Sequence, residues 1–333
     1  NQSIERVFIS IPRFSVGAIP ATFGIVSNTV RDGNNLLKPY PSWSWHVNLE
    51  QCNFYRLVSV FRTWVDECNR LWVLDSGVVG DDQWCPPQIL IFNADTDELL
   101  HKYEIPFDIH RNRTTYVTPA VELETIGNVS ICEKAWLYGA DVNGSLLVYS
   151  LEQNQAWSYR HPSFNYNENY TTMVIEGLSF SFNDGVLGLA LSPVFNGKSR
   201  RLYYHSLNGN TENWVYTDYL RNRVNDSQIF NTLPNERGEQ SAPQAFDKWG
   251  NLYFSLINSV EVVSWNIKYP YRRKFWKIIG NNQKTMQFPS GLKVSLGKQG
   301  QEQLWIFATS IQRYATGNLN NSQINFRLFY RDL

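Results

Sequence analysis

Short apolar runs of four to six residues, followed by turn residues, recur along the whole chain. They span Arg6 to Ile11, Leu71 to Leu74, Ala135 to Tyr138, Arg201 to His205, Leu252 to Leu256 and Leu304 to Ala308. Runs of this length, bounded by Gly, Asn, Asp and Pro, are typical of β-strands. Equivalent points in the runs are Val7, Leu71, Trp136, Leu202, Leu252 and Leu304, and they are 50 to 66 residues apart. Because a unit of this size holds four short antiparallel strands, each unit is predicted to be one blade of a β-propeller, and six units fit the chain.

Tight turns inside several units predict antiparallel hairpins. The segment Trp136 to Tyr149 has an Asn-Gly pair between two apolar runs, and Phe246 to Trp265 has two turns of this kind. No window above ten residues has the apolar spacing of an amphipathic helix together with caps. No change of composition marks a linker either. We therefore predict an all-β fold, a six-bladed β-propeller that forms a single domain over residues 1–333.

The segment Cys68 to Pro106 is the clearest example of the pattern. Its apolar runs, Leu71 to Leu74 and Ile89 to Phe92, flank a loop that is rich in Gly and Asp and contains Cys85. This arrangement predicts two antiparallel strands joined by a long loop that a disulfide holds in place. We expect the segment to lie at the boundary between two blades.

Composition supports a β-rich chain and excludes some classes of binding partner. Aromatic residues make up 15% of the chain and charged residues only 18%, a mixture suited to half-buried sheet faces. Thirty acidic and thirty basic residues cancel, and no basic run exceeds three residues, so no nucleic-acid partner is expected. No apolar run reaches the roughly 20 residues that a membrane-spanning helix needs. The first residues do not resemble a signal peptide, so we expect no membrane partner and a mature chain whose signal peptide has been removed.

Four cysteines and several sequons indicate a secreted, extracellular glycoprotein. The cysteines are even in number and form no CxxC pair, so disulfides are favoured over metal ligation, and three pairings remain open. The Asn-X-Ser/Thr sequons begin at Asn1, Asn112, Asn128, Asn143, Asn169, Asn225 and Asn320. Each is a candidate glycosylation site.

Three acidic residues at predicted strand ends are the candidates for acid–base chemistry: Asp75, Asp141 and Glu176. A carboxylate near glycine also commonly accepts hydrogen bonds from a tight turn, and this structural interpretation is favoured for Asp75 and Asp141. The five histidines lack metal-binding spacings, and no nucleophile elbow, phosphate loop or dinucleotide fingerprint is present. We expect no metal and no cofactor.

Seven segments spread over nearly the whole chain carry a family resemblance. They are VFISIPRFSVGAIPATF (Val7 to Phe23), LLKPYPSW (Leu36 to Trp43), VDECNRLWVLDSG (Val65 to Gly77), CPPQILIFNADTDELLHKYEIP (Cys85 to Pro106), GLALSP (Gly188 to Pro193), RLYYHSL (Arg201 to Leu207) and NFRLF (Asn325 to Phe329). In these segments the chain resembles the insect yellow and major royal jelly protein family. The resemblance implies a secreted six-bladed β-propeller, which agrees with the repeat.

The same resemblance implies the disulfides Cys68–Cys132 and Cys52–Cys85. It also implies that family members carry a segment before the point where this chain begins, which helps to close the ring of blades. We expect that segment to be absent here and Ile324 to Phe329 to pair with strands near one terminus.

A ligand site on the last blade is also implied by the resemblance. Salivary members that bind amines hold the ligand with a Thr, an Asn and a Phe, and the matching positions here are Ser290, Thr309 and Ile311. Only a hydroxyl is retained. The loss of the amide and of the aromatic face argues against high-affinity amine binding. A small aromatic or amine ligand in the central channel is still expected as a partner, because propeller channels hold small molecules with a few polar anchors.

The sequence leaves three functional hypotheses open. The first is a secreted, non-enzymatic protein that acts in an extracellular matrix such as cuticle or eggshell, acts in pigmentation, or binds a small ligand or an extracellular protein. The second is dopachrome conversion in melanin synthesis, which is associated with some yellow-family members and needs an acid or a base. The third is the binding of biogenic amines. The absence of a readable catalytic set favours the first hypothesis, so we do not expect an enzyme.

Overall fold

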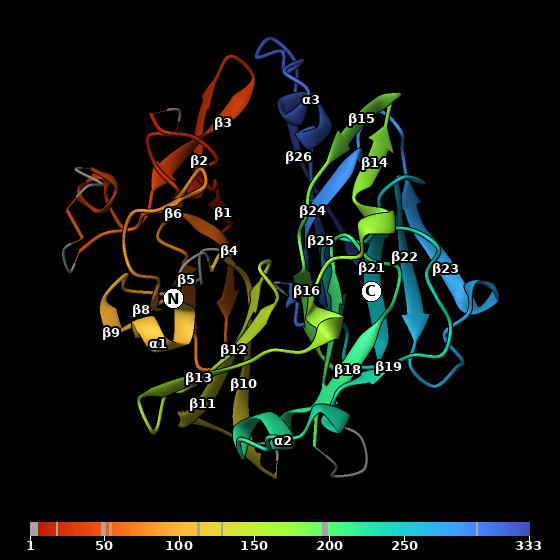
Figure 1. Ribbon diagram of the computed structural model, residues 1–333. Coiled ribbons are helices and arrows are strands. Elements are labelled where there is room, and N and C mark those ends of the chain that lie inside the picture. Colours follow the sequence, from red (N-terminus) through yellow and green to blue (C-terminus); the bar gives the residue numbers. More distant parts are fainter. Residues whose placement is uncertain are drawn as a thin grey trace. The chain divides into compact units, whose positions relative to one another are not determined.

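β-Strands dominate the computed structural model, which describes residues 6–17, 19–47, 51–52, 55–111, 114–127, 129–194, 199–297 and 299–333 (Figure 1). The strands are β1 (Phe8–Ser10), β2 (Phe23–Arg31), β3 (Asn34–Pro39), β4 (Val60–Val65), β5 (Arg70–Asp75), β6 (Val78–Val79), β7 (Asp82–Gln83), β8 (Gln88–Asn93), β9 (Leu99–Glu104), β10 (Tyr116–Ile126), β11 (Val129–Asp141), β12 (Ser145–Ser150), β13 (Gln155–Tyr159), β14 (Thr172–Ile175), β15 (Leu178–Ser181), β16 (Val186–Leu191), β17 (Arg201–Ser206), β18 (Asn213–Tyr216), β19 (Asn231–Thr232), β20 (Gln244–Phe246), β21 (Asn251–Leu256), β22 (Glu261–Asn266), β23 (Trp276–Asn281), β24 (Phe288–Leu296), β25 (Glu302–Thr309) and β26 (Phe326–Asp332).

Helices are few and short. The α-helices are α1 (Phe107–His110), α2 (Thr217–Arg221) and α3 (Ile311–Ala315), and the 3₁₀ turns are η1 (Trp43–His46), η2 (Pro162–Phe164), η3 (Glu168–Tyr170), η4 (Ser227–Ile229) and η5 (Arg273–Phe275). Within the described part of the chain, no helix is both long enough and apolar enough to cross a membrane.

Six antiparallel sheets of three or four strands follow one another along the described residues, and they are the blades of a six-bladed β-propeller. Four blades have four strands each, in the orders β4-β5-β8-β9, β10-β11-β12-β13, β16-β17-β18-β19 and β20-β21-β22-β23. The first blade, β1-β2-β3, and the last, β24-β25-β26, have three strands in the described chain. The predicted fold class is confirmed.

The chain divides into two compact units. The first comprises residues 1–141 and 147–158, and the second comprises residues 142–146 and 159–333. Each unit has apolar cores of its own, one built around Trp72 and Leu137 in the first unit and one built around Phe254 and Trp265 in the second. A fully buried side chain of this size contributes roughly 1.5 to 3 kcal/mol, so these layers between strands stabilise each unit.

The spacing of apolar runs found the second strand of five blades. Leu71, Trp136, Leu202, Leu252 and Leu304 lie in β5, β11, β17, β21 and β25, each of which is the second strand of its sheet. Val7 does not fit, because it precedes β1, the first strand of its sheet. The equivalent strand there is β2, whose second half is exposed, and it therefore lacks the continuous apolar run of the others.

The segment Cys68 to Pro106 lies inside one blade. Strands β5 and β8 pair antiparallel, with Leu71 opposite Phe92, so the predicted strand pair is confirmed. The predicted boundary between blades is wrong, because β9 follows β8 in the same sheet and β4 precedes β5 there. The loop of residues 76–87 leaves this sheet, forms the small hairpin β6–β7 and returns to it.

The predicted hairpins are also present. An Asn143-Gly144 turn joins β11 to β12, and Gly144 has a φ of +85°, which favours glycine. Strands β20, β21 and β22 form the second predicted meander. Strand β26 pairs with β25 from Phe326 to Asp332, and this register includes most of the segment that was expected to pair near one terminus.

Candidate functional site

Two disulfides are formed, Cys52–Cys85 and Cys68–Cys132, and both lie in the first unit. Their Cα–Cα distances are 5.4 Å and 5.9 Å, within the usual range for this bond. These are the two pairs that the family resemblance implies. No free cysteine remains in the chain, so thiol chemistry is excluded.

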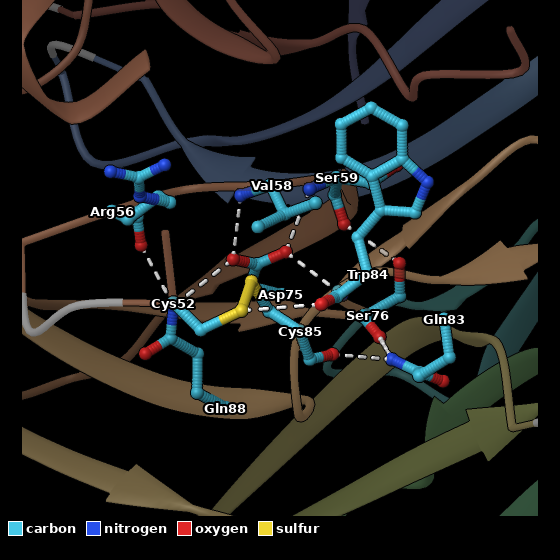
Figure 2. The surroundings of a disulfide bond; sticks show 11 residues. Cys52, Arg56, Val58, Ser59, Asp75, Ser76, Gln83, Trp84, Cys85 and Gln88 are labelled. Carbon is cyan, nitrogen blue, oxygen red and sulfur yellow. Dashed lines mark hydrogen bonds between the residues drawn. A yellow bond between two sulfur atoms is a disulfide. The ribbon is translucent and has the colours of Figure 1, made fainter. Parts of the chain in front are cut away.

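Asp75, the first candidate acid, is fully buried beside the Cys52–Cys85 disulfide (Figure 2). Its carboxylate accepts hydrogen bonds from the backbone N–H groups of Val58 at 2.8 Å, Ser59 at 2.7 Å and Gly77 at 3.1 Å. Nε2 of Gln88 donates a fourth, at 3.1 Å. Four donors fill most of the lone-pair positions of a carboxylate, so Asp75 fixes the start of β4 and the turn after β5. This arrangement leaves it poorly placed to exchange a proton with a ligand.

Asp141 has a similar structural environment. It lies at the end of β11 in the first unit, it is fully buried, and it accepts a hydrogen bond from the backbone N–H of Thr115 at 2.8 Å. The bond ties the start of β10 to the end of its neighbour. The geometry agrees with the structural interpretation favoured for both aspartates.

Glu176, the third candidate, lies in the second unit and is partly exposed. It occupies the turn between β14 and β15 with a φ of +55°, next to Gly177 with a φ of +76°, the pattern of a two-residue hairpin turn. Its carboxylate accepts a hydrogen bond from a terminal nitrogen of Arg313 at 2.7 Å. The Arg313 hydrogen bond is the main cause that lowers the pKa of Glu176, and burial opposes it. Glu176 is therefore ionised at neutral pH.

The three predicted ligand residues lie at one end of the β24–β25 pair. Ser290 is the extra residue of a bulge in β24, where its hydroxyl donates to the carbonyl of Phe307 at 3.3 Å. Thr309 is the last residue of β25, and Ile311 begins α3 two residues later. All three are partly buried. We call residues 287–290 and 309–313 the β25–α3 site.

A glutamine at the start of β24 holds the turn between β25 and α3. Oε1 of the buried Gln287 accepts hydrogen bonds from the Ser310 hydroxyl at 3.2 Å and from Nε2 of Gln312 at 2.8 Å. Gln312 is fully buried. These bonds fix the polar side chains of the site before any ligand arrives.

Three buried polar atoms of the β25–α3 site have no hydrogen-bond partner among the described residues: Oγ1 of Thr309, Oε1 of Gln312 and Nε of Arg313. They comprise a hydroxyl, a carbonyl acceptor and a charged N–H donor. Each buried group left in this state costs about 1 to 3 kcal/mol. Because native proteins satisfy most such groups, three within five residues make the β25–α3 site a candidate binding site for a polar ligand.

The β14–β15 hairpin, which is also in the second unit, contacts the β25–α3 site. Phe180 in β15 packs edge to face against Phe288 at the start of β24, with 6.4 Å between ring centroids. On the other strand, the N–H of Val174 donates to Oδ1 of Asn258 at 2.9 Å. The hairpin therefore brings an aromatic ring and the Glu176 carboxylate to the β25–α3 site.

Comparison with known proteins agrees with this fold. The family model described as "Major royal jelly protein" matches residues 58–333. The chain belongs to the major royal jelly protein family. The match covers the last five blades and five of the seven sequence segments, and the resemblance to this family is confirmed.

Two curated relatives of the chain carry names of different kinds. Major royal jelly protein 9 of Apis mellifera is 33% identical over 338 residues, which cover 97% of this chain and 76% of that protein. Dopaminechrome tautomerase of Drosophila melanogaster is 28% identical over 342 residues, which cover 97% of this chain and 72% of that protein. One of these two relatives is thus named for an enzymatic activity.

Among solved structures, a streptogramin B lyase aligns with a TM-score of 0.43 and 13% identity over 85% of this chain and 68% of that chain. A nidogen and laminin complex aligns with a TM-score of 0.49 and 11% identity over 91% of this chain and 85% of that chain. These similarities are too remote to bear on the site of this family member.

Sequence reasoning missed the residues that complete the β25–α3 site, namely Phe180, Gln287, Gln312 and Arg313. The run Ser310 to Arg313 follows an apolar strand, and this change from apolar to polar residues was the only local signal. Phe180 and Glu176 come from a hairpin more than a hundred positions earlier in the sequence. No local pattern could have placed them here.

The histidines show no metal-binding arrangement, and in the part of the chain that is described no three His, Cys, Asp or Glu residues are grouped as ligands. His205 instead lies in a fully buried network, where its Nδ1 is 2.9 Å from Glu212. Arg237 donates to the same carboxylate at 3.0 Å. Burial is the main cause that lowers the pKa of His205, and Arg237 adds to it.

Four sequon asparagines lie in described and exposed positions: Asn143, Asn169, Asn225 and Asn320. The other three, Asn1, Asn112 and Asn128, lie outside the described residues. Exposure permits glycosylation at the four described positions.

Proposed function

We propose that this chain is a secreted, non-enzymatic binding protein whose β25–α3 site holds a small aromatic molecule with hydroxyl or amine groups. The observation that supports this proposal is the set of three buried, unpartnered polar atoms on Thr309, Gln312 and Arg313. Disulfides and exposed sequons support secretion.

The chemistry of the unpartnered atoms narrows the ligand. Oε1 of Gln312 only accepts hydrogen bonds, Nε of Arg313 only donates them, and the Thr309 hydroxyl can do either. A ligand that satisfies all three has both donor and acceptor groups. The ring of Phe288 and its neighbour Phe180 supply an aromatic wall, and the ionised Glu176 nearby favours a ligand that is neutral or positively charged.

Titration calorimetry with dopamine, serotonin and a neutral catechol tests the proposal. Thr309→Val removes the unpartnered hydroxyl while it keeps the shape of the side chain. It should weaken binding roughly threefold to tenfold, the value of one hydrogen bond. Thr309→Ser keeps the hydroxyl and is the matched control, so it should retain most of the affinity.

A second variant tests the acceptor. Gln312→Met keeps the length of the side chain but removes its whole amide, both the carbonyl acceptor and the Nε2 bond to Gln287, and it should also weaken binding. If none of the three compounds binds the wild-type protein, or if both variants bind as tightly as the wild type, the β25–α3 site is not the binding site.

The alternative is an isomerase-type enzyme that converts a dopachrome-like substrate, and the relative named dopaminechrome tautomerase favours it. Asp75 and Asp141 are fully buried and hydrogen-bonded to backbone N–H groups, so Glu176 is the carboxylate best placed to act as a base there. Turnover of dopachrome by the purified protein, abolished by Glu176→Gln, would establish the enzyme. Ligand binding without turnover would favour the binding protein.

The roles in cuticle, pigmentation or eggshell, and the extracellular protein partner, are part of the same proposal. They rest on family membership, and a pull-down from the secreting tissue tests them.

A further inference from the structure

A polar groove of about 500 Å³ lies on the second unit, and its longer wall is the segment that precedes the β14–β15 hairpin in the sequence. Its walls are the connection between β13 and β14 and the turn between β17 and β18. We call it the 162–169 groove, after the residues of the longer wall. It is separate in sequence from the β25–α3 site and shares no residue with it.

The walls of the groove are held rigidly. The N–H of Asn167 donates to the carbonyl of Asn208 at 2.7 Å, and the Ser206 hydroxyl donates to the carbonyl of Asn165 at 2.8 Å. These bonds join the two walls to each other. A ligand that enters the groove would not have to order it first, which favours binding.

Several polar side chains in the lining make no hydrogen bond to the described residues. They are the exposed amides of Asn165 and Asn169 and the carboxylate of Glu168. Asn210, which is 5% exposed, uses its amide nitrogen for the Tyr170 hydroxyl at 2.7 Å and for Glu236 at 2.6 Å. Its Oδ1 accepts no hydrogen bond from the described residues, so an acceptor remains available.

The remaining lining selects a class of ligand. Tyr166 is 40% exposed and offers an aromatic face, and the lining contains no lysine or arginine. Amides and a carboxylate bind hydroxyl groups, and an aromatic ring packs on the apolar face of a sugar ring. The absence of a basic residue from the lining and the presence of Glu168 disfavour phosphates and other anions.

We propose that the 162–169 groove binds a pyranose disaccharide unit. Two sources share this chemistry: the N-linked glycan of the sequon Asn169-Tyr170-Thr171, or a free saccharide. Asn169 is itself part of the lining, so a glycan attached there is held at high effective concentration beside Tyr166.

The free saccharide is tested with the Thr171→Ala variant, which removes the sequon without changing a residue of the lining. N,N′-diacetylchitobiose, the disaccharide that begins an N-linked glycan, is titrated and followed by saturation-transfer NMR. The variant should bind it, and a further Tyr166→Ala change should weaken binding about threefold to tenfold, as expected for one aromatic contact. Tyr330→Ala, at an exposed tyrosine of β26 outside the groove, is the control and should leave binding unchanged.

The attached glycan is tested in the glycosylated wild-type protein. A glycosidase releases glycans from the folded protein, and peptide mass spectrometry measures the rate of release at Asn169 and at the exposed Asn225. A glycan seated in the groove should be released several times more slowly than the one at Asn225, and Tyr166→Ala should remove this difference. A melting temperature equal to that of the wild type shows that Tyr166→Ala is folded.

Two results support the groove as a saccharide site. One is binding of the free disaccharide that Tyr166→Ala weakens, and the other is slow release of the attached glycan that Tyr166→Ala abolishes. The proposal is overturned if Thr171→Ala does not bind chitobiose up to its solubility limit and the Asn169 glycan, where present, is released as fast as that at Asn225.

Discussion

The surroundings of Asp75 in the first unit and the β25–α3 site in the second both contain buried polar atoms, yet the hydrogen bonding of these atoms is opposite. Asp75 has four hydrogen-bond donors around one carboxylate. The β25–α3 site leaves one polar atom on each of Thr309, Gln312 and Arg313 without a partner in the described part of the chain. A polar group whose hydrogen bonds are complete stabilises the fold, whereas one left incomplete lowers stability until a ligand completes it.

This difference separates two kinds of candidate that look alike in the sequence. Asp75 follows a strand and precedes a turn, and Thr309 also ends a strand before a turn. Only the count of their partners indicates that the first residue is structural and favours the second as a ligand-binding candidate.

The largest expected effect is at Asp75. Asp75→Ala leaves the N–H groups of Val58, Ser59 and Gly77 without their acceptor, so it should lower the free energy of unfolding by about 3 to 5 kcal/mol. Urea unfolding measures the loss. Asp81→Ala, at an exposed aspartate of the following loop, is the control and should change stability by less than about 0.5 kcal/mol. A loss as small as that of the control would show that Asp75 does not hold the turn.

Asp184, just before β16 in the second unit, is the contrasting carboxylate, since no described residue donates a hydrogen bond to it. Burial raises its pKa to about 6. The folded state therefore binds more protons than the unfolded state between pH of about 4 and about 6, and stability should fall as pH rises through this window. Asp184→Asn should raise the free energy of unfolding at pH 7 by about 2 kcal/mol and have little effect at pH 4.

Urea unfolding of both proteins at four pH values between 4 and 7 checks this prediction. A constant difference across the range would mean that the carboxylate of Asp184 does not titrate as the structure indicates.

Thr309→Val tests the stability effect of an unpartnered polar atom in the β25–α3 site. Because the Thr309 hydroxyl is buried with no partner among the described residues, its removal should raise the free energy of unfolding of the ligand-free protein by about 1 kcal/mol. Thr309→Ser, which keeps the hydroxyl, should not stabilise. A polar-to-apolar change that stabilises the empty protein but weakens ligand binding is the expected signature of a binding residue. Destabilisation by Thr309→Val would instead indicate that the hydroxyl has a partner.

The smallest effect is expected at the partly exposed pair of Glu176 and Arg313. Glu176→Gln should lower the free energy of unfolding by about 0.5 kcal/mol at pH 7 and low salt. Since the pKa of Glu176 is lowered in the folded state, this contribution is present above its unfolded pKa of about 4.3 and is lost as pH falls through the folded value. Thermal unfolding at low and high salt measures it, and a difference that is independent of salt would contradict an ionic origin.

The sequence by itself determined the class of the fold. Alternating and continuous apolar runs such as Leu71 to Leu74 specify strands, and Asn143-Gly144 specifies a hairpin turn, because these signals act over a few neighbouring residues. The repeat of the runs then indicated six blades, and the one wrong point, Val7, fell where the exposed half of β2 weakens the apolar signal.

Only the tertiary structure decided which polar residues meet. Gln312 and Gln287 come from different strands and turns, and Glu176 reaches Arg313 from 137 positions away. The Asp75 carboxylate has its hydrogen bonds and the Thr309 hydroxyl lacks one. This difference depends on which donors and acceptors other parts of the chain contribute. A local sequence pattern fixes the backbone of each element, but the hydrogen bonds that a buried side chain keeps or lacks are set by the packing of elements far apart in sequence.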